Sequence, residues 1–217
     1  MKRQDTLGRI VATGVLPVVR APSPELALRV VAALLAGGLD VIELTMTVPG
    51  AIQVIADLCK RHGQAVLVGA GTVLDAEAAR KCLAAGAAFV VSPILLDGET
   101  VVACHAAEAP VIMGALTPTE VVRAWRAGAD LVKVFPCGAV GGASYVKALR
   151  APLPEIELVP TGGVSLSTVG DFIRAGARAV GAGADLVDLA LLRDGKDAAL
   201  SDNARRYLDA VAAARKG

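Results

Sequence analysis

The sequence is poor in the residues that form several common kinds of functional site. Aromatic residues make up only 3% of the chain, and the two histidines, His62 and His105, are too few for a histidine-rich zinc centre. The four cysteines contain no Cys-x-x-Cys pair, so we expect them to be reduced core residues of a cytosolic protein. The composition predicts a site without a metal, and we expect no cofactor.

An excess of charge of one sign is also missing. Lysine plus arginine (22) nearly balance aspartate plus glutamate (21), which gives no electrostatic reason to expect binding to nucleic acid or an anionic membrane. No apolar run approaches the ~20 residues of a membrane span, and the start Met-Lys-Arg-Gln-Asp lacks the apolar core of a signal peptide. We therefore expect a cytoplasmic protein whose partner is a small molecule.

The chain is instead rich in apolar residues, which make up 54% of its 217 positions and are mainly Ala, Val, Leu and Ile. The length predicts one domain over residues 1–217. Short β-type runs alternate with helical segments that begin at capping residues and end at glycines. Strands are predicted at 14–20, 41–45, 65–73, 89–93, 110–116, 131–136, 156–161 and 179–183. Helices are predicted at 1–12, 24–37, 50–61, 76–86, 98–108, 118–128, 143–150, 166–176 and 197–215, four of them capped by Ser23, Asp75, Thr117 and Ser165.

This alternation of strands and helices predicts a parallel α/β fold. At this length an eight-fold (β/α)8 TIM barrel with an extra N-terminal helix fits best. An open doubly wound sheet is the alternative, but no Gly-x-Gly-x-x-Gly follows the first strand.

The run Leu131–Pro136 is the most informative segment, because a single lysine interrupts an apolar strand. Side chains alternate along a strand, so Lys133 shares a face with Leu131 and Phe135. An unpaired buried ammonium is costly, so this lysine is neutral, paired or catalytic, unless it extends from the strand end to solvent.

An internal register predicts a partner for Lys133. Four helices end in Ala-Gly just before strands two, four, six and eight, at Gly38, Gly86, Gly128 and Gly176. Counting five residues onward from each gives Glu43, Val91, Lys133 and Gly181. Alternate strands of a barrel contribute one layer of interior side chains, so Glu43 and Lys133 are predicted to face each other. The alternative is a structural ion pair, but a buried pair is a poor stabiliser compared with apolar residues.

A lysine opposite a glutamate suggests a specific chemistry. An apolar site disfavours the charged lysine and frees its amine to attack a carbonyl, while the glutamate shuttles protons. The residues alone therefore suggest a Schiff-base lyase or aldolase and leave the substrate open.

Further polar groups and glycines follow other strands, at the end of a barrel where active sites lie. Arg20 ends the first strand and is suited to binding an anion, or it is a surface arginine at a loop. Thr72 ends the third strand and offers a hydroxyl. Gly162, Gly163 and Gly183, after strands seven and eight, occupy the usual phosphate position of such barrels.

Six segments, in order and over nearly the whole chain, carry a family resemblance. They are Leu16–Arg20, Ile42–Thr45, Val68–Val73, Val91–Pro93, Val132–Pro136 and Val159–Val164. Together they resemble the bacterial 2-keto-3-deoxy-6-phosphogluconate (KDPG) and 4-hydroxy-2-oxoglutarate (KHG) aldolase family. The resemblance implies a metal-free class I aldolase, usually a homotrimer, that releases pyruvate from a 2-keto-3-deoxy acid. For KDPG this is the cleavage step of the Entner–Doudoroff pathway.

The resemblance also assigns roles to residues. Lys133 would form the Schiff base and Glu43 would be the general acid/base. Thr72, Pro93, Phe135 and Thr161 would line the pyruvate end, and Gly162, Gly163 and the loop at Gly183 would hold the phosphate.

Two positions depart from the common family pattern. Many members carry an arginine for the substrate carboxylate where this sequence has Thr47. Another branch also has threonine there and an arginine at the end of strand one, so we hypothesise that Arg20 supplies the charge. The loop after strand eight usually reads Gly-Ser, with a hydroxyl that touches phosphate, but here Ala184 replaces the serine. Asp185 beside it would repel phosphate if it pointed inward.

Three other readings of the sequence stay open. The first is an aldolase for the 6-phosphogalactonate epimer or for KHG. The second is a barrel that binds phosphosugars, or an isomerase, with Lys133 in a structural ion pair. The third is a metal-dependent class II aldolase, which the two histidines disfavour.

Overall fold

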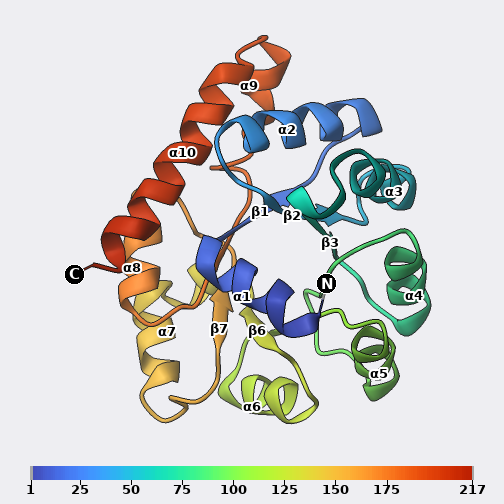
Figure 1. Cartoon of the computed structure of the whole chain (residues 1–217). Helices are drawn as coiled ribbons and strands as arrows, with labels where there is room; N and C mark the ends of the chain where they lie inside the picture. Colours follow the sequence, from blue (N-terminus) through green and yellow to red (C-terminus); the bar gives the residue numbers. More distant parts are fainter. Residues whose placement is uncertain (1, 217) are drawn as a thin grey trace.

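The computed structural model describes residues 2–216 and shows eight parallel strands in one sheet that curls into a barrel (Figure 1). The strand order is β7-β6-β5-β4-β3-β2-β1-β8, and a parallel bridge between Thr161 and Gly181 joins the two edges. The strands are β1 (Val15–Val19), β2 (Val41–Thr45), β3 (Leu67–Gly71), β4 (Val90–Val91), β5 (Val111–Ala115), β6 (Leu131–Val134), β7 (Leu158–Pro160) and β8 (Val180–Ala182). This arrangement confirms the predicted barrel and excludes the open sheet.

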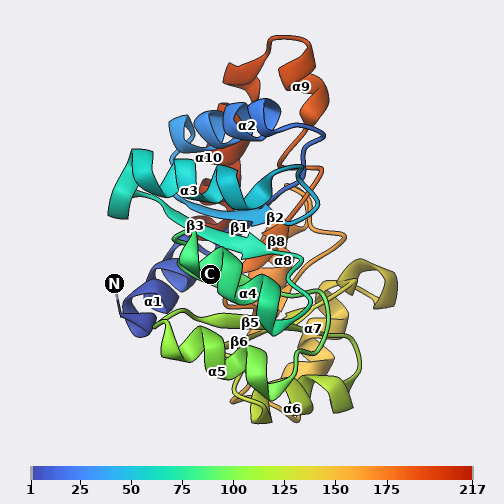
Figure 2. The same cartoon turned by 90° about the vertical axis from the view of Figure 1, so that its right-hand side faces the viewer.

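Helices surround the barrel, and one additional helix lies across its end (Figures 1 and 2). They are α1 (Arg3–Thr13), α2 (Pro24–Ala36), α3 (Ala51–His62), α4 (Ala76–Ala84), α5 (Gly98–Ala106), α6 (Pro118–Arg126), α7 (Ala143–Arg150), α8 (Val169–Arg174), α9 (Leu189–Arg193) and α10 (Asp197–Ala214). Two short 3-10 turns are η1 (Gly63–Ala65) and η2 (Cys137–Val140). Helix α1 is the predicted N-terminal helix. Met1 and Gly217, the ends of the predicted domain, lie outside the described residues.

Local capping explains where several of these helices begin and end. Ser23 accepts a hydrogen bond from the Leu26 N–H, and Asp75 accepts one from the Ala78 N–H. The four glycines of the Ala-Gly repeat all adopt positive φ, between 92° and 101°, which lets the chain turn from each helix into the next strand. The recurrent Ala-Gly pattern therefore marks helix ends, as predicted.

Some predicted boundaries were wrong. Ser165 does not cap the helix before β8, because that helix begins at Val169 with Thr168 at its N-cap. Instead, the Ser165 carbonyl accepts hydrogen bonds from the Thr168 and Val169 N–H groups, so a turn precedes α8. Ala65 lies in η1 rather than in β3, and α9 and η2 were not predicted. These short elements lack the periodicity of a full helix or strand.

The apolar side chains form two cores. One fills the space between the outer face of the sheet and the surrounding helices. The other fills the barrel near the amino-terminal ends of its strands, where Ile10 of α1 packs with Leu16, Phe89, Val91 and Leu131. Figure 2 shows α1 on the side from which the strand arrows start. Helix α1 therefore closes the amino end of the barrel, which leaves the carboxyl end for a functional site.

The cysteines are free, as expected, but one of them is not a core residue. Cys82, Cys104 and Cys137 are buried, whereas Cys59 is only partly buried. Burial raises the pKa of Cys82 to about 11, so its thiol stays protonated near neutral pH. Cys59 lies near the end of α3, where the helix surface meets solvent.

Within residues 2–216, every helix is too short or too polar to cross a bilayer.

Candidate active site

Lys133 and Glu43 face each other inside the barrel, as the register predicted. The lysine Nζ lies 3.4 Å from Glu43 Oε1, and the two side chains are 4% and 1% exposed. The Lys133 Nζ also lies 5.6 Å from the centre of the Phe135 ring. A charged pair at this depth costs desolvation energy and stabilises the fold poorly, so it is a candidate for chemistry.

Room for the glutamate comes from a glycine on the neighbouring strand. A Cβ atom on Gly71 of β3 would lie 2.3 Å from Glu43 Oε1, which is closer than non-bonded atoms can approach. The backbone of β3 therefore forms a wall directly against the carboxylate. Gly71 of the Gly-Ala-Gly segment therefore makes room for the Glu43 carboxylate.

Two buried side-chain oxygens, one of them in this pair, have no hydrogen-bond partner in the described part of the chain. They are Glu43 Oε2 and Thr161 Oγ1. A third such oxygen, Glu157 Oε2, forms an ion pair with Arg178 and is compensated in that way. Buried polar atoms are nearly always satisfied, so an orphaned oxygen on Glu43 and another on Thr161 indicate positions where a bound polar molecule belongs.

The hydroxyl of Thr161 depends on a glycine in the same manner as the glutamate. A Cβ atom on Gly181 of β8 would lie 2.2 Å from Thr161 Oγ1. The β7–β8 edge of the barrel is thus open enough for a hydroxyl that points inward. This side chain is 5% exposed.

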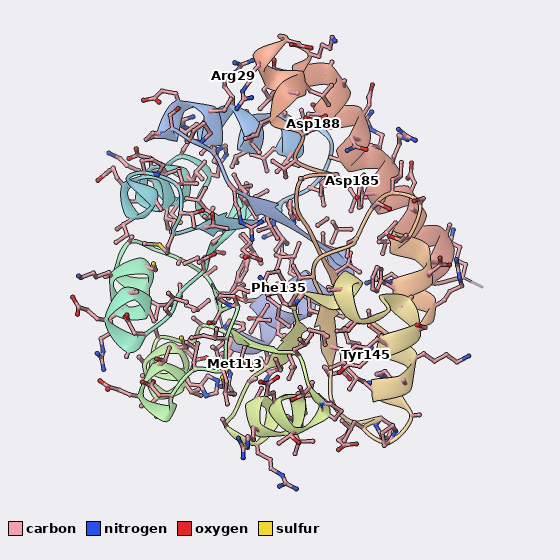
Figure 3. All side chains as sticks on the ribbon, turned by 180° about the vertical axis from the view of Figure 1, so that it is seen from behind. Arg29, Met113, Phe135, Tyr145, Asp185 and Asp188 are labelled. Carbon is pink, nitrogen blue, oxygen red and sulfur yellow. The ribbon has the colours of Figure 1, made fainter. Side chains whose placement is uncertain are left out.

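A cavity of about 270 Å³ opens at the carboxyl ends of β1, β6, β7 and β8. It brings together six of the predicted site residues, which are Arg20, Phe135, Thr161, Gly162, Gly163 and Gly183. In Figure 3, which views the molecule from behind, Phe135 lies near the centre of the barrel. Within the described residues, the backbone N–H groups of Gly163, Gly183 and Ala184 donate to no protein acceptor. The cavity therefore offers free donors to an anion.

Arg20 lies at the β8 side of this cavity. Its Nη1 is 3.7 Å from the position that a Cβ on Gly183 would take. The side chain is exposed, and no ion pair or side-chain hydrogen bond involves it within the described residues. A free guanidinium beside free N–H donors is an anion-binding arrangement.

The other predicted residues lie on the opposite arc of the barrel end. Thr72 follows β3 with φ of 60°, a conformation uncommon for a residue with a Cβ and typical of functional sites. Pro93 follows β4, and its carbonyl approaches Gly114 of β5 so closely that a Cβ there would lie 2.2 Å away. Thr47 follows β2 and is exposed. None of these three lines the 270 Å³ cavity.

Sequence reasoning missed Thr45. It is fully buried, and its hydroxyl is 3.0 Å from the Val19 carbonyl and 2.7 Å from Thr47 Oγ1. Thr45 thus links the end of β1, just before Arg20, to Thr47. Its position two residues after Glu43 on the same strand face was the available signal.

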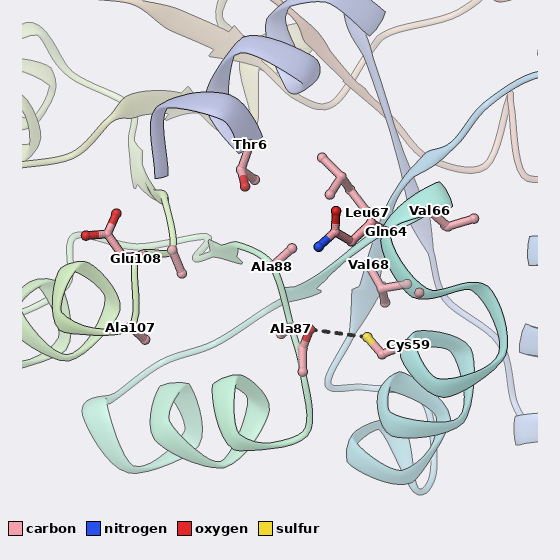
Figure 4. Close-up of a pocket in the computed structure, with 13 residues that line it drawn as sticks. Thr6, Cys59, Gln64, Val66, Leu67, Val68, Ala87, Ala88, Ala107 and Glu108 are labelled. Atoms are coloured by element: carbon pink, nitrogen blue, oxygen red, sulfur yellow. Dashed lines mark hydrogen bonds between the residues drawn. The ribbon is translucent and has the colours of Figure 1, made fainter. Parts of the chain in front are cut away.

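A second cavity, of about 320 Å³, lies at the amino end of the barrel beside α1 (Figure 4). Its lining includes Thr6, Cys59, Gln64 and Glu108. The Cys59 thiol donates to the Gly86 carbonyl at 3.2 Å, and burial raises its pKa. This second cavity contains none of the predicted site residues, so we do not assign it to the reaction.

Within residues 2–216, no group of three or more His, Cys, Asp or Glu side chains is arranged to hold a metal ion. His105 instead pairs with Asp130, with His105 Nε2 at 3.2 Å from the carboxylate. The same carboxylate oxygen accepts the Val111 N–H. His105 therefore has a structural partner between α5 and the start of β6.

Known proteins share this sequence and fold. A family model described as KDPG and KHG aldolase matches residues 8–202. The chain is 37% identical over 159 residues to a 2-dehydro-3-deoxy-phosphogluconate aldolase of Treponema pallidum, covering 73% of this chain and 75% of that protein. It is 34% identical over 170 residues to a 2-dehydro-3-deoxy-6-phosphogalactonate aldolase of Escherichia coli K12, covering 78% and 82%.

A solved structure shows the same architecture with a reaction intermediate. It is a KDPG aldolase from Legionella pneumophila with pyruvate captured as a covalent carbinolamine. The two folds superpose with a TM-score of 0.83 at 28% identity, over 94% of this chain and 97% of that one.

Proposed function

Because this chain belongs to the KDPG and KHG aldolase family, we propose that it cleaves a 2-keto-3-deoxy sugar acid, such as KDPG, through a Schiff base on Lys133. The products are pyruvate and an aldehyde, which is D-glyceraldehyde 3-phosphate when the substrate is KDPG. The observation that carries this proposal is the buried pair of Lys133 and Glu43, 3.4 Å apart, in which Glu43 Oε2 has no protein partner.

The reaction begins when Lys133 passes a proton to Glu43 and the resulting free amine attacks the C2 ketone to form a carbinolamine. Glu43 donates the proton with which water leaves, so a protonated imine forms. Its second oxygen, which has no protein partner, is free to hold the water or hydroxyl that exchanges this proton. The low exposure of both groups keeps bulk water away from the imine.

Bond cleavage follows from the same two residues. Glu43, as carboxylate, takes the proton of the C4 hydroxyl, and the electrons of the C3–C4 bond move to the iminium to give an enamine. The aldehyde then leaves. Protonation of C3 and hydrolysis of the imine release pyruvate and restore Lys133. Each proton removed is returned later, so Glu43 ends in its starting state.

The remaining residues bind the two ends of the substrate. Thr72, Pro93, Phe135 and Thr161 contact the pyruvate part. The orphaned Thr161 hydroxyl supports this assignment, because it needs a partner in the cavity. Gly162, Gly163 and Gly183 bind the distal phosphate through backbone N–H groups, two of which are free of protein acceptors.

Arg20 supplies the cation of the site in place of the arginine that Thr47 replaces. Its position beside Gly183 favours the distal phosphate over the carboxylate that the sequence suggested. Arg20→Ala separates the two roles. Weaker capture of pyruvate itself would assign Arg20 to the carboxylate, whereas a raised KM for phosphorylated substrates alone would assign it to the phosphate.

The test of the reaction class is intact-protein mass spectrometry after incubation with pyruvate and borohydride. We expect one reduced pyruvyl adduct on the wild type and none on Lys133→Met, which keeps an unbranched side chain without the amine. Lys147→Met, on the surface helix α7, is the matched control and keeps the adduct. An adduct that persists in Lys133→Met, or none in folded wild type, would refute the scheme.

The 6-phosphogalactonate epimer is the second candidate substrate. The relative from Escherichia coli K12 that is named for this activity supports it, because its identity of 34% is close to that of the KDPG relatives. Turnover of the two C4 epimers, compared as kcat/KM, decides between them. KHG belongs in the same panel, since it lacks the phosphate.

The proposal also covers assembly and location. Exposed apolar side chains on the loops after β3 and β4, namely Leu74, Ile94 and Leu95, support association of copies, and we propose a homotrimer. Light scattering on a sizing column tests this, and a monomer would refute it. We propose a cytoplasmic enzyme of the Entner–Doudoroff route, in keeping with its unpaired thiols.

A further inference from the structure

The cavity at the carboxyl end contains two charged side chains of opposite sign. They are Arg20 and Asp185. If the Asp185 carboxylate pointed into this cavity, it would repel a phosphate. It would also pair with the Arg20 guanidinium, which would then not be free to bind the phosphate. The direction of the Asp185 side chain therefore matters for any anionic substrate.

Asp185 lines this cavity, but both donors that hold its Oδ1 come from residues outside the cavity lining. Its Oδ1 accepts the Leu166 N–H at 2.9 Å and the Tyr207 hydroxyl at 2.5 Å. Leu166 belongs to the turn that follows the Gly162-Gly163 segment, and Tyr207 belongs to α10. In Figure 3, Asp185 lies between the barrel and the long C-terminal helix.

The same helix binds the backbone of this loop. Asn203, one turn before Tyr207, donates to the carbonyl of Asp185 at 2.8 Å and to that of Leu186 at 3.3 Å. Residues four apart lie on one helix face, so Asn203 and Tyr207 act together on the turn after β8. Tyr207 is fully buried, which fixes the position of its ring.

The Tyr207 hydroxyl stays protonated and can therefore donate a hydrogen bond to Asp185. Burial and the neighbouring Asp185 carboxylate both raise the pKa of Tyr207, so its hydroxyl keeps its proton throughout the physiological range. A hydrogen bond to a charged acceptor biases the carboxylate between two orientations by roughly ten- to a hundredfold.

We infer that Tyr207 is a positioning residue for the distal anion: it holds the Asp185 carboxylate away from the cavity and fixes the two backbone segments that bind the phosphate. Tyr207 touches neither the substrate nor the reacting atoms. Its effect passes through Asp185 and the Leu166 turn. This inference rests on the proposed aldolase function, and it extends that function by assigning a phosphorylated substrate to a site that lacks the usual serine hydroxyl.

The test begins with Tyr207→Phe, which removes one oxygen and keeps the buried ring. We expect KM for KDPG to rise about three- to tenfold, because only the fraction of molecules with Asp185 bound outward accepts the phosphate. We expect kcat, and KM for the unphosphorylated KHG, to change by less than about twofold. Equal changes for both substrates, or none for either, would overturn the inference.

A second variant separates charge from structure. Asp185→Asn in the Tyr207→Phe background removes the repelling charge and keeps an acceptor for Leu166. We expect the double variant to bind KDPG better than Tyr207→Phe alone. A purely structural role of Tyr207 predicts no such rescue, so a double variant that is equal to or worse than the single variant would contradict the inference.

The effect of Tyr207 on binding of the distal anion can also be measured without catalysis. Titration of Lys133→Met with glycerol 3-phosphate, with and without Tyr207→Phe, reports binding of the distal anion when no Schiff base forms. Weaker binding in the Tyr207→Phe protein supports the inference, and equal binding refutes it. The pyruvate–borohydride adduct on wild type independently reports the proposed function, so failure of either idea is seen separately.

Discussion

The two ends of the barrel differ in how completely their polar groups are paired. At the amino end, Arg9 of α1 donates to the Gln64 carbonyl at 2.8 Å and to Asp40 at 2.6 Å, while Arg215 donates to the last carbonyls of α1. At the carboxyl end, Glu43 Oε2, Thr161 Oγ1 and several backbone N–H groups have no protein partner within the described residues.

The apolar contacts show the same contrast. Ile10 and Phe89 fill the amino end of the barrel interior, whereas glycines such as Gly71 and Gly181 leave space toward the carboxyl end. At the amino end, buried apolar side chains and paired polar groups stabilise the fold. At the carboxyl end, unpaired polar groups and open space are available to bind a substrate. The comparison predicts that substitutions at the two ends will affect different quantities.

The largest effect short of losing Lys133 is expected for Glu43→Gln. The amide keeps the size of the side chain but cannot take the C4 proton, so kcat should fall by about 10²–10⁴. Steady-state cleavage of KDPG measures this. Glu108→Gln, which changes an acid lining the amino-end cavity, is the matched control and should leave kcat within about twofold. A Glu43→Gln enzyme that also keeps its rate would remove the glutamate from the mechanism.

Gly71→Ala is expected to be next in size. The new methyl would overlap Glu43 Oε1, so the carboxylate must move, and a displacement of about 1 Å costs roughly a hundredfold in rate. Gly8→Ala in α1 is the control, since nothing lies within 4 Å of the added carbon. It should raise the free energy of unfolding by up to about 1 kcal/mol and leave kcat unchanged. Equal kcat values for Gly71→Ala and Gly8→Ala would contradict the predicted difference between the two ends of the barrel.

Ile10→Ala should show the reverse pattern. This side chain is 1% exposed inside the amino end, so its truncation should lower the free energy of unfolding by about 2–4 kcal/mol. Urea denaturation measures this loss, and kcat should stay near that of wild type at temperatures where the variant is folded. Val102→Ala, at a side chain that is 68% exposed, should change stability by less than about 0.5 kcal/mol. A large fall in kcat for folded Ile10→Ala would mean that the ends are coupled.

The smallest effect is expected from chelation. A Schiff-base aldolase uses the iminium as its electron sink, so EDTA treatment should leave kcat/KM within about twofold. A strong loss that Zn²⁺ or Mg²⁺ restores would contradict the class I mechanism.

The sequence by itself determined the barrel and the central pair. Glycines that end helices and β-branched runs that form strands are local signals, because they follow from the conformational preferences of single residues. The constant offset of five residues from each helix-ending glycine then placed Glu43 opposite Lys133, since barrel strands contribute to common layers. The predicted cap at Ser165 was wrong because a turn there competes with the helix start, and both use the same kinds of residue.

Other features came only from the tertiary structure. The position of Arg20 beside Gly183 depends on the closure of β8 onto β1, and the hydrogen bond that holds the Asp185 carboxylate comes from Tyr207 of α10, more than fifteen residues later in the chain. Side-chain direction at the end of a strand is decided by whichever donor the packing brings near, and no local pattern encodes that. The sequence therefore placed Lys133 opposite Glu43, while long-range packing decided where Arg20 and Asp185 lie at the carboxyl end.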